Sequence, residues 1–182
     1  MQFKQTDIPE VLIIEPRVFE DARGFFMETY QARQFAEAGI ESDFVQDNHS
    51  CSTQYTLRGF HYQVRHAQGK LVRVVAGKIF DVAVDLRRSS STFGRWVGVL
   101  LSAQDKRQLW VPPGFAHGFY VVSKWAEVLY KATDYYDPEA ERCILWNDPT
   151  LNVIWPIGAG KMPVLSPKDL AGKLFAEAEG YD

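Results

Sequence analysis

The stretch Leu71–Leu86, LVRVVAGKIFDVAVDL, decides which class of fold the chain adopts. It contains two apolar segments, Leu71–Val75 and Ile79–Leu86, separated by the compact sequence Ala76-Gly77-Lys78. Alternation of side-chain character is typical of a β-strand, and a glycine between two such segments predicts a tight turn. The second segment alternates, with Ile79, Asp81, Ala83 and Asp85 on one face and Phe80, Val82, Val84 and Leu86 on the other. The stretch therefore predicts two successive strands.

The same signals recur along the chain. Short β-like runs separated by turn residues are expected at Val11–Ile14, Gly24–Tyr30, Trp96–Leu101, Gln108–Val111, Gly118–Val122 and Glu127–Thr133. Many short strands at close spacing favour an antiparallel sandwich or barrel. Because no linker or internal repeat interrupts them, we expect residues 1–182 to form one domain. The predicted fold is all-β, a jelly-roll barrel with a few short peripheral helices.

Helix signals are confined to two segments. Gln31–Ala38, QARQFAEA, is followed by Gly39, a residue suited to the position after a helix C-terminus. The sequence Ser-Pro-Lys-Asp, starting at Ser166, places Asp169 three residues after a potential N-cap, as in a capping box. We therefore expect a second short helix over Pro167–Ala178.

The composition argues against several classes of partner. The net charge is −3, from 20 Lys+Arg and 23 Asp+Glu, and no long basic run suggests a nucleic-acid partner. No apolar run approaches the roughly 20 residues that cross a bilayer, and the N-terminal sequence lacks the pattern of a signal peptide. Cys51 and Cys143 are far apart and form no disulfide or metal-binding pattern. We therefore expect a cytoplasmic protein with reduced thiols and no membrane partner.

The stretch Leu57–Lys70, LRGFHYQVRHAQGK, raises the main functional question. His61 within it could be a metal ligand, a core histidine bonded to backbone, or a proton-transfer base. The core interpretation also applies to His117, because buried polar groups are usually satisfied by hydrogen bonds without any further role.

A metal is disfavoured by the number of available ligands. Pro112-x-Gly114-x-x-His117 is similar to the second motif of cupin barrels, whose metal-binding members supply His-x-His and a Glu from the first motif. Here the first motif reads His61-Tyr62-Gln63, and no Glu follows where one would be needed. Two imidazoles are a poor ligand set for a divalent ion, and the nearby cation Lys70 would repel one. We therefore expect no metal.

Seven stretches together resemble one family closely. They are DARGFFMETY, QDNHSCS, LRGFHYQ, KLVRVVAGKIFDVAVDLRRSSSTFG, QLWVPPGFAHGF, YKATDYYDP and WNDPTLNVIWP. In this order and spacing, which covers nearly the whole chain, they resemble the dTDP-4-dehydrorhamnose 3,5-epimerase family. The resemblance implies a metal-free cupin-type barrel that acts as a homodimer in dTDP-L-rhamnose synthesis and needs no cofactor. The implied substrate is dTDP-4-dehydro-6-deoxy-D-glucose, epimerised at C3 and C5.

The resemblance also implies the catalytic residues. His61 is the implied base, a role that suits an imidazole because its ordinary pKa of about 6.5 lies near working pH. Asp169 is implied to orient His61 and to stabilise its protonated form, in addition to its capping-box position. Lys70 is implied to face the oxygen at C4, where negative charge develops. Tyr130 is implied to be the acid on the opposite face of the sugar.

The binding residues follow in the same way. Arg58 is implied to meet the diphosphate, and Arg23 to reach the nucleotide or a phosphate in the site of the partner subunit; the planar fork of Arg matches phosphate oxygens. Leu170 stands where some relatives carry a basic residue, which could alter a peripheral nucleotide contact. The remaining implied binding residues are Phe26, Glu28, Gln46, Asn48, His117, Tyr136 and Glu141.

Three alternatives remain at this point. The chain could epimerise only one carbon or isomerise the keto group of another deoxysugar. It could be a sugar-nucleotide binding protein without catalysis, with Arg58, Lys70 and the aromatic residues serving binding alone. It could also be a metal-dependent dioxygenase. The full set of His61, Lys70, Tyr130 and Asp169 favours the double epimerase. The presence of both a candidate base and a candidate acid argues against a binding protein without catalysis.

Overall fold

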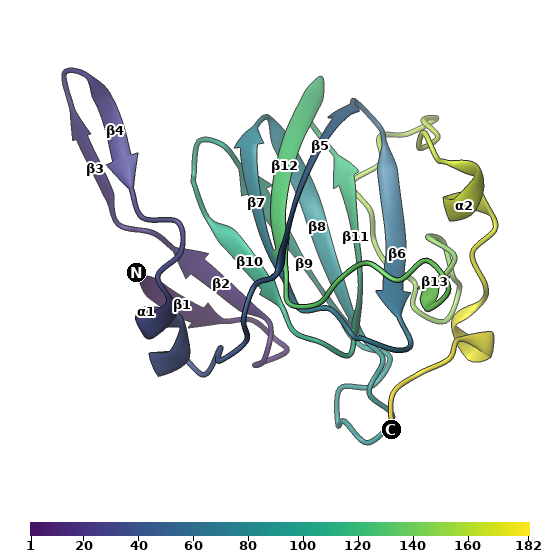
Figure 1. The fold of residues 1–182 in the computed structure, drawn as a ribbon. Coiled ribbons are helices and arrows are strands. Elements are labelled where there is room, and N and C mark those ends of the chain that lie inside the picture. The colour runs from purple at the N-terminus through teal and green to yellow at the C-terminus, as the bar shows by residue number, and fades with distance from the viewer.

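The computed structural model describes residues 1–182, which fold around two facing antiparallel β-sheets (Figure 1). In spatial order, the six-stranded sheet contains β1 (Gln2–Gln5), β2 (Leu12–Glu15), β10 (Gln108–Val111), β7 (Lys70–Ala76), β12 (Trp125–Ala132) and β5 (Gln46–Thr53). The five-stranded sheet contains β13 (Glu141–Cys143), β6 (Leu57–Gln63), β11 (Phe115–Val121), β8 (Lys78–Asp85) and β9 (Trp96–Ser102). The predicted all-β jelly-roll barrel with short peripheral helices is confirmed.

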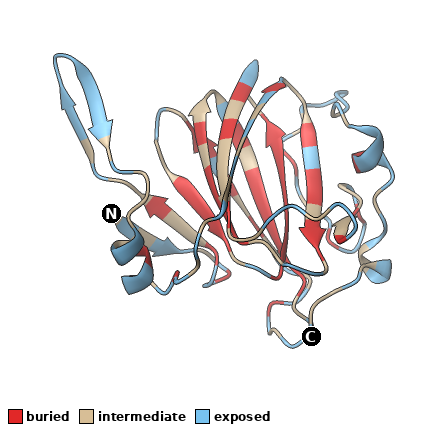
Figure 2. Ribbon diagram, in the orientation of Figure 1, coloured by how far each residue is buried: buried red, intermediate tan, exposed pale blue.

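A separate two-stranded ribbon projects from this barrel. It is formed by β3 (Val18–Asp21) and β4 (Gly24–Met27), and Figures 1 and 2 show it standing clear of both sheets with an exposed surface. Phe19, Phe25 and Phe26 on this ribbon are 49%, 59% and 67% exposed. The ribbon therefore presents aromatic rings that this chain does not cover.

The stretch Leu71–Leu86 forms β7 and β8, as predicted, but the two strands belong to different sheets. Gly77 joins them with a φ of +76°, and a Cβ there would lie 2.1 Å from the carbonyl oxygen of Trp125. Only glycine fits both the positive φ and this close backbone approach. The turn thus carries the chain from one layer of the barrel to the other.

The interior between the sheets is the main hydrophobic core. Sixteen buried residues form it, including Val72 and Val74 of β7, Val128 of β12, and Ile79 and Ala83 of β8. Burial of each large apolar side chain stabilises the fold by about 1.5–3 kcal/mol. The Ile79 face of β8, which also carries two aspartates, is therefore the inner face.

The opposite face of the five-stranded sheet is buried as well. Val82 and Val84 pack there with Phe60, Tyr120 and Trp155. Trp155 belongs to the C-terminal segment, which lies along the outside of this sheet (Figure 1). Both faces of this sheet are covered, so nearly every residue of β8 and β11 is buried (Figure 2).

The first predicted helix is confirmed as α1 (Ala32–Glu37). Its buried residue Phe35 contacts Phe3, Tyr30 and Phe44 edge-on, which attaches the helix to the six-stranded sheet. Gly39 follows the helix with a φ of +84°, as expected of a residue after the C-terminus. No helix of the protein is long and apolar enough to cross a membrane.

The predicted helix over Pro167–Ala178 is wrong in its length. The capping box at Ser166 and Asp169 is confirmed, but α2 spans only Pro167–Leu170, and a 3₁₀ turn, η1, follows at Phe175–Glu177. Between them the Lys173 N–H donates to the Cys143 carbonyl, and the Lys173 carbonyl accepts from the Leu145 N–H. The helix ends because this backbone pairs with the segment after β13.

The sequence patterns also missed strands. The stretch Gln46–Ser52, which was not predicted as a strand, lies in β5 and pairs with residues Ala126–Ala132 of β12. Its polar residues are alternately half-buried and exposed, so the strand is amphipathic without apolar residues. The strands β1, β3, β6 and β13 were likewise not predicted.

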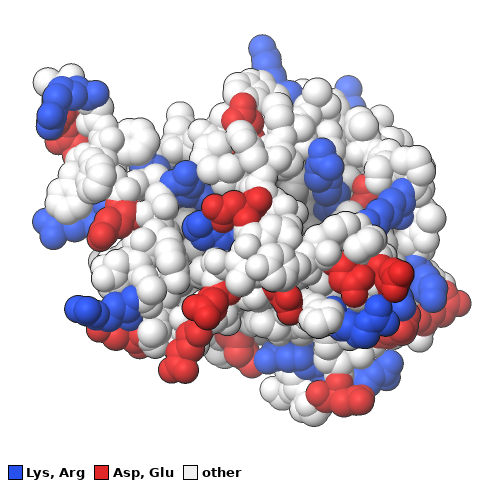
Figure 3. Space-filling model, viewed as in Figure 1, with Lys and Arg blue, Asp and Glu red and all other residues white.

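Charged side chains are mixed over the surface. On the face shown in Figure 3, Lys and Arg are interspersed with Asp and Glu. Several charged residues of the protein form ion pairs, such as Lys131–Asp47 and Arg142–Glu179. Surface pairs of this kind contribute about 0–1 kcal/mol each. On this face no broad basic surface forms.

Candidate active site between the two sheets

Polar side chains from both sheets converge inside the barrel. On β11, His117 shares the inner face with Phe115, Phe119 and Val121, which are core residues. His61 is the register partner of His117 on β6, so its side chain lies on the same face. From the opposite sheet, Tyr130 packs against the core. The interior of the barrel therefore contains a polar region, with His61, His117 and Tyr130, next to the apolar core.

The close approach of β6 and β11 brings the two histidines together. A Cβ on Gly59 would lie 2.5 Å from Gly118 Cα, and one on Gly118 would lie 2.8 Å from the Arg58 carbonyl oxygen. Gly59 also has a φ of +126°, which L side chains rarely adopt. Two facing glycines thus allow β6 to run against β11 at this point.

His61 is held by Asp169. Its Nε2 lies 2.7 Å from Asp169 Oδ1, although the two residues are 108 positions apart. The imidazole is 30% exposed and the carboxylate 3% exposed. Asp169 Oδ1 also accepts the Gly59 N–H, and Oδ2 accepts the N–H and hydroxyl of Ser166.

These contacts fix the ionisation state of Asp169. Burial alone would raise the pKa of this carboxyl, but hydrogen bonds from His61, Ser166 and Gly59 outweigh burial and lower it well below its ordinary value. An ionised carboxylate can only accept hydrogen bonds. Nε2 of His61 must therefore carry a proton, which leaves the lone pair of a neutral imidazole on Nδ1.

A second His–Asp pair lies beside the first. His117 Nε2 lies 2.7 Å from Asp81 Oδ1, and both residues are buried. Asp81 Oδ2 is buried without any hydrogen-bond partner. Asp81 comes from the inner face of β8, two residues before Ala83, which is the register partner of His117.

Lys70 is the first residue of β7, and it lies on the inner face of the six-stranded sheet. It is only 8% exposed and makes no ion pair with a carboxylate. Burial lowers the pKa of its ammonium to about 8, and the charges of Glu141 and Asp81 limit this decrease. Lys70 is therefore a buried cation that faces the histidine side of the barrel.

Tyr130 lies on β12 between Val72 of β7 and Asn48 of β5. Burial is the main cause that raises the pKa of its phenol, which the charge of Arg58 partly offsets. The phenol therefore remains protonated at neutral pH. His61 and Tyr130 come from opposite sheets, so a flat molecule between the sheets would meet one group on each face.

Arg58 reaches from β6 to the neighbouring strand β5. Its Nε donates to Ser52 Oγ at 3.1 Å, and Ser52 is 6% exposed. The two terminal nitrogens of the guanidinium make no hydrogen bond within the chain and can meet an anion. Nearby on the inner face of β5, Asn48 Nδ2 and Ser50 Oγ are buried without partners, while Gln46 donates to Asn48 Oδ1.

Glu141 connects the site to the surface. Its Oε1 lies 3.7 Å from His61 Nδ1, and its Oε2 accepts the hydroxyl of Tyr136 at 2.5 Å and pairs with Lys168. Burial would raise the pKa of this carboxyl, but Lys168 and Tyr136 lower it below its ordinary value. Glu141 is thus an anion beside the free nitrogen of His61.

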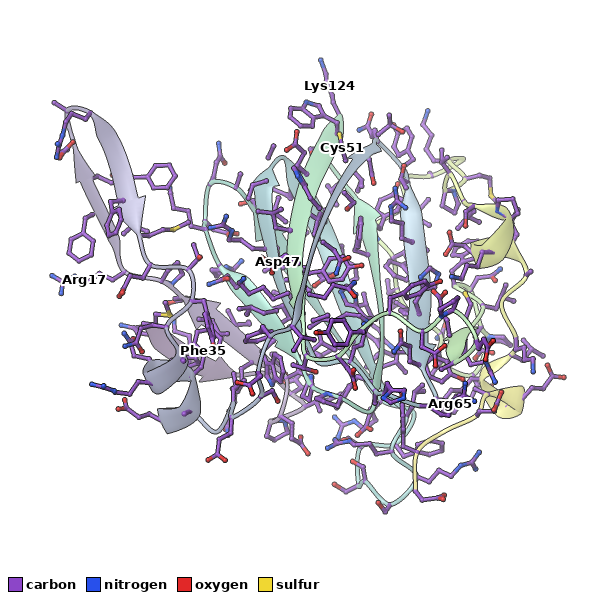
Figure 4. All side chains as sticks on the ribbon, in the orientation of Figure 1. Arg17, Phe35, Asp47, Cys51, Arg65 and Lys124 are labelled. Atoms are coloured by element: carbon purple, nitrogen blue, oxygen red, sulfur yellow. The ribbon has the colours of Figure 1, made fainter.

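The ribbon residues are not part of this cluster in a single chain. Arg23 is exposed and bonded to Asp21 within the ribbon, and Phe26 and Glu28 are exposed. Figure 4 shows side chains on both sides of the ribbon, and the Lys106 ammonium lies 4.7 Å from the centroid of the Phe25 ring. Of the predicted site residues, the structure therefore brings together His61, Tyr130, Lys70, Asp169, Gln46, Asn48, Arg58, His117, Tyr136 and Glu141, and leaves Arg23, Phe26 and Glu28 apart.

Several residues of the site were not identified from the sequence. Asp81, Ser52, Lys168 and Cys143 each contact or adjoin a predicted site residue. The only signal for Asp81 was its place in the alternation of β8 beside core residues. Nothing near Cys143 in the sequence indicates that it lies opposite His61 in the ladder between β13 and β6.

Cys143 changes the premise of the argument against a metal. From the sequence, two imidazoles and no thiolate or carboxylate were expected as ligands. In the folded chain, one ligand atom each from His61, Cys143 and Asp169 lie within 4.8 Å of one another. The sequence therefore indicated too few potential metal ligands near His61, because Cys143 and Asp169 come from distant segments of the chain.

A groove elsewhere in the structure includes Tyr130 and Asn48 in its lining, but not His61 or Lys70. It lies on the outer face of the six-stranded sheet, has a volume of about 290 Å³, and is lined partly by Asp47, His49, Arg73 and Lys131. These residues point away from the barrel interior, because they alternate with inner-face residues along their strands.

Comparisons with known proteins show which family this chain resembles. Residues 5–177 match the model of the family described as dTDP-4-dehydrorhamnose 3,5-epimerase. A protein of that name from Pseudomonas aeruginosa is 59% identical over 182 residues, which is 100% of this chain and 99% of the relative.

Two solved structures are also informative. A dTDP-6-deoxy-D-glucose-3,5-epimerase from Legionella pneumophila, in complex with dTDP-4-keto-L-rhamnose, is 53% identical with a TM-score of 0.94, covering 98% of this chain and 94% of that one. A 3′-monoepimerase from Streptomyces bikiniensis, in complex with dTDP-quinovose, is 30% identical with a TM-score of 0.87, covering 94% and 87%. This chain belongs to the dTDP-4-dehydrorhamnose 3,5-epimerase family.

Proposed function

We propose that this protein epimerises C3 and C5 of dTDP-4-dehydro-6-deoxy-D-glucose to give dTDP-4-dehydro-L-rhamnose, in dTDP-L-rhamnose synthesis. The observation that carries the proposal is the placement of His61 and Tyr130 on opposite sheets, with the buried cation Lys70 on the inner face of one sheet. A base, an acid and a positive charge are the groups that inversion next to a carbonyl requires.

His61 removes the proton in this mechanism. The C–H bonds at C3 and C5 are both α to the C4 carbonyl, so their electrons can move onto the C4 oxygen. Nδ1 of His61 is the free nitrogen, because the contact with Asp169 keeps the proton on Nε2. The Asp169 carboxylate then stabilises the imidazolium that forms.

Lys70 stabilises the enolate. The negative charge that develops on the C4 oxygen meets an ammonium that is shielded from water and already in position. Such a buried charge stabilises the enolate more than a charge in solvent would, because no surrounding water has to reorient during the reaction. The His117–Asp81 pair lies beside this position and is proposed to contact the same part of the sugar.

Tyr130 returns a proton to the opposite face of the sugar. Its phenol is protonated at neutral pH, and a carbanion-like enolate carbon is basic enough to take that proton. Each inversion therefore leaves His61 protonated and Tyr130 ionised. Both groups must exchange a proton with solvent before the second carbon can react.

The remaining residues are proposed to bind the nucleotide sugar. Arg58, held at Nε by Ser52, has its terminal nitrogens available for the diphosphate. Buried polar atoms without partners, such as Asn48 Nδ2, suit a polar ligand. Gln46, Tyr136 and Glu141 are proposed to line the same pocket.

The active form is proposed to be a homodimer in which Arg23, Phe26 and Glu28 complete the site of the partner. Support comes from the ribbon, whose phenylalanine side chains are about half exposed or more in the single chain. We further propose that residues 1–182 act as one domain and that the enzyme works in the cytoplasm. Two free cysteines agree with a reducing compartment.

The experiment is incubation with dTDP-4-dehydro-6-deoxy-D-glucose in deuterated water, followed by NMR of the product. The proposal predicts deuterium at both C3 and C5 and inversion of both centres. Inversion at one carbon would assign the protein to single-centre epimerases instead. Saturable dTDP binding without any exchange would indicate a binding protein.

A further inference from the structure

The proton-transfer pair has a third neighbour that the proposed reaction does not use. Cys143 lies on β13 as the register partner of His61 on β6, and Asp169 approaches from α2. The ligand atoms of these three residues all lie within 4.8 Å of one another. The Cys143 thiol donates only to the adjacent Ile144 carbonyl, at 3.6 Å.

This donor set has the chemistry of a zinc site. Thiolate, imidazole and carboxylate are the ligands that Zn²⁺ takes in proteins, in tetrahedral sites with bonds of about 2.0–2.3 Å. Tetrahedral geometry at such bond lengths places ligand atoms about 3.3–3.8 Å apart. The present separations of up to 4.8 Å, and of 2.7 Å for His61 and Asp169, require shifts of about 1 Å or less.

The surroundings of His61 add independent support. When an imidazole binds a metal through Nε2, its other nitrogen carries the proton and usually donates to a carboxylate or carbonyl. His61 Nδ1 already faces Glu141 Oε1 at 3.7 Å. Asp169 is in turn oriented by hydrogen bonds from the Ser166 hydroxyl and the Gly59 N–H, as carboxylates that bind a metal commonly are.

We propose that His61, Cys143 and Asp169 form an inhibitory site for a thiophilic divalent cation such as Zn²⁺ or Cd²⁺. The inhibition, though not the binding, rests on the proposed function. The cation binds His61 Nε2, Cys143 Sγ and an Asp169 carboxylate oxygen, and water fills the fourth position. The softness of the thiolate excludes Mg²⁺ and Ca²⁺, which prefer oxygen ligands.

Inhibition follows from the proton balance. Cys143 releases its thiol proton to solvent when the S–metal bond forms, while the Nε2 proton of His61 is replaced by a proton on Nδ1. No electron is transferred. The lone pair that removes the substrate proton is then occupied, and the metal holds the imidazole away from the sugar. The cation is thus an inhibitor and takes no part in the epimerisation.

The test compares the two cysteines of the chain. Cys51 is exposed on β5 and serves as the matched control (Figure 4). Metal-free protein is titrated with CdCl₂ while the ultraviolet thiolate-to-metal charge-transfer band is recorded, and with ZnCl₂ against a chromophoric chelator. Wild type and Cys51→Ala should bind one equivalent with equal affinity. Cys143→Ala should lose the band, and its Zn²⁺ affinity should fall by more than about 100-fold.

A second variant tests the outer contact. Glu141→Gln should weaken Zn²⁺ binding by about 10–100-fold, as removal of an outer-shell partner does. Zn²⁺ should also protect Cys143, but not Cys51, from alkylation in the wild type, a readout that needs no substitution and no folded variant. MgCl₂ should give neither protection nor a spectral change.

Solvent-deuterium exchange into the keto sugar supplies the inhibition readout. Zn²⁺ should stop exchange in wild type and Cys51→Ala, whereas Cys143→Ala should keep its own metal-free rate at the same zinc concentration. Equal zinc affinity in Cys143→Ala and wild type, or full exchange by the zinc-loaded wild type, would overturn the proposal. Absence of exchange in metal-free wild type would instead contradict the proposed function, since metal binding is measured without substrate.

Discussion

Replacement of Lys70 by methionine should stabilise the folded protein while strongly slowing its reaction. Lys70 is 8% exposed, and burial lowers the pKa of its ammonium from the ordinary value of 10.5 to about 8. Between these pH values the unfolded chain binds more protons than the folded chain, so stability rises with pH over this range. At pH 7 the buried ammonium therefore costs about 3 kcal/mol of folding free energy.

Methionine has a similar length and no charge, so it removes this cost without leaving a cavity. We expect Lys70→Met to raise the free energy of unfolding at pH 7 by about 1–3 kcal/mol, with a smaller gain at pH 10. Urea unfolding followed by tryptophan fluorescence measures both values. The control is Lys124→Met, whose side chain points into solvent (Figure 4) and should change stability by less than about 0.5 kcal/mol.

The same substitution should slow deuterium exchange by about 100–1,000-fold, the usual effect of removing one group that stabilises an oxyanion. In the wild type, exchange should decline as pH rises through about 8, because Lys70 loses its charge there. A Lys70→Met variant that is less stable than wild type at pH 7, or that exchanges deuterium at the wild-type rate, would refute this reasoning.

Three further experiments test the proposed roles. Tyr130→Phe should allow deuterium exchange but strongly reduce inversion, because the enolate then regains its proton from His61 on the original face; equal loss of both, measured by NMR, would contradict the acid role. Asp169→Asn removes a charged partner of His61 and should slow exchange about 10–150-fold without weakening dTDP binding, as calorimetry can show. Mixing inactive Arg23→Ala with inactive His61→Ala chains should restore about a quarter of wild-type activity if Arg23 acts in the partner's site. No recovery after verified subunit exchange would show that it does not.

Much of the fold could be predicted from local patterns. The alternation in Ile79–Leu86 and the glycine at position 77 identified two strands and their turn, because these features depend on adjacent residues. The strand β5 was missed since its polar residues carry no apolar alternation, and its pairing with β12 depends on distant sequence. The second helix was predicted too long because Lys173 pairs with the backbone at Cys143, which no local signal indicates.

The site was accessible mainly through resemblance. From the residues alone, His61 remained a ligand, a core residue or a base. The structure adds the contact with Asp169 across 108 positions and the pairing of His117 with Asp81, neither of which has a spacing rule. For Arg23 the resemblance implies more than the single chain shows. Arg23 is bonded only to Asp21 within the ribbon, and its implied role in the partner's site cannot be seen in one chain.

The central claim is that His61 is the base that removes protons from a 4-keto sugar. It is tested most directly by NMR of dTDP-4-dehydro-6-deoxy-D-glucose incubated in deuterated water with wild type and with His61→Ala. We predict deuterium at C3 and C5 with the wild type and at neither carbon with the variant. Exchange by His61→Ala at the wild-type rate would contradict the account.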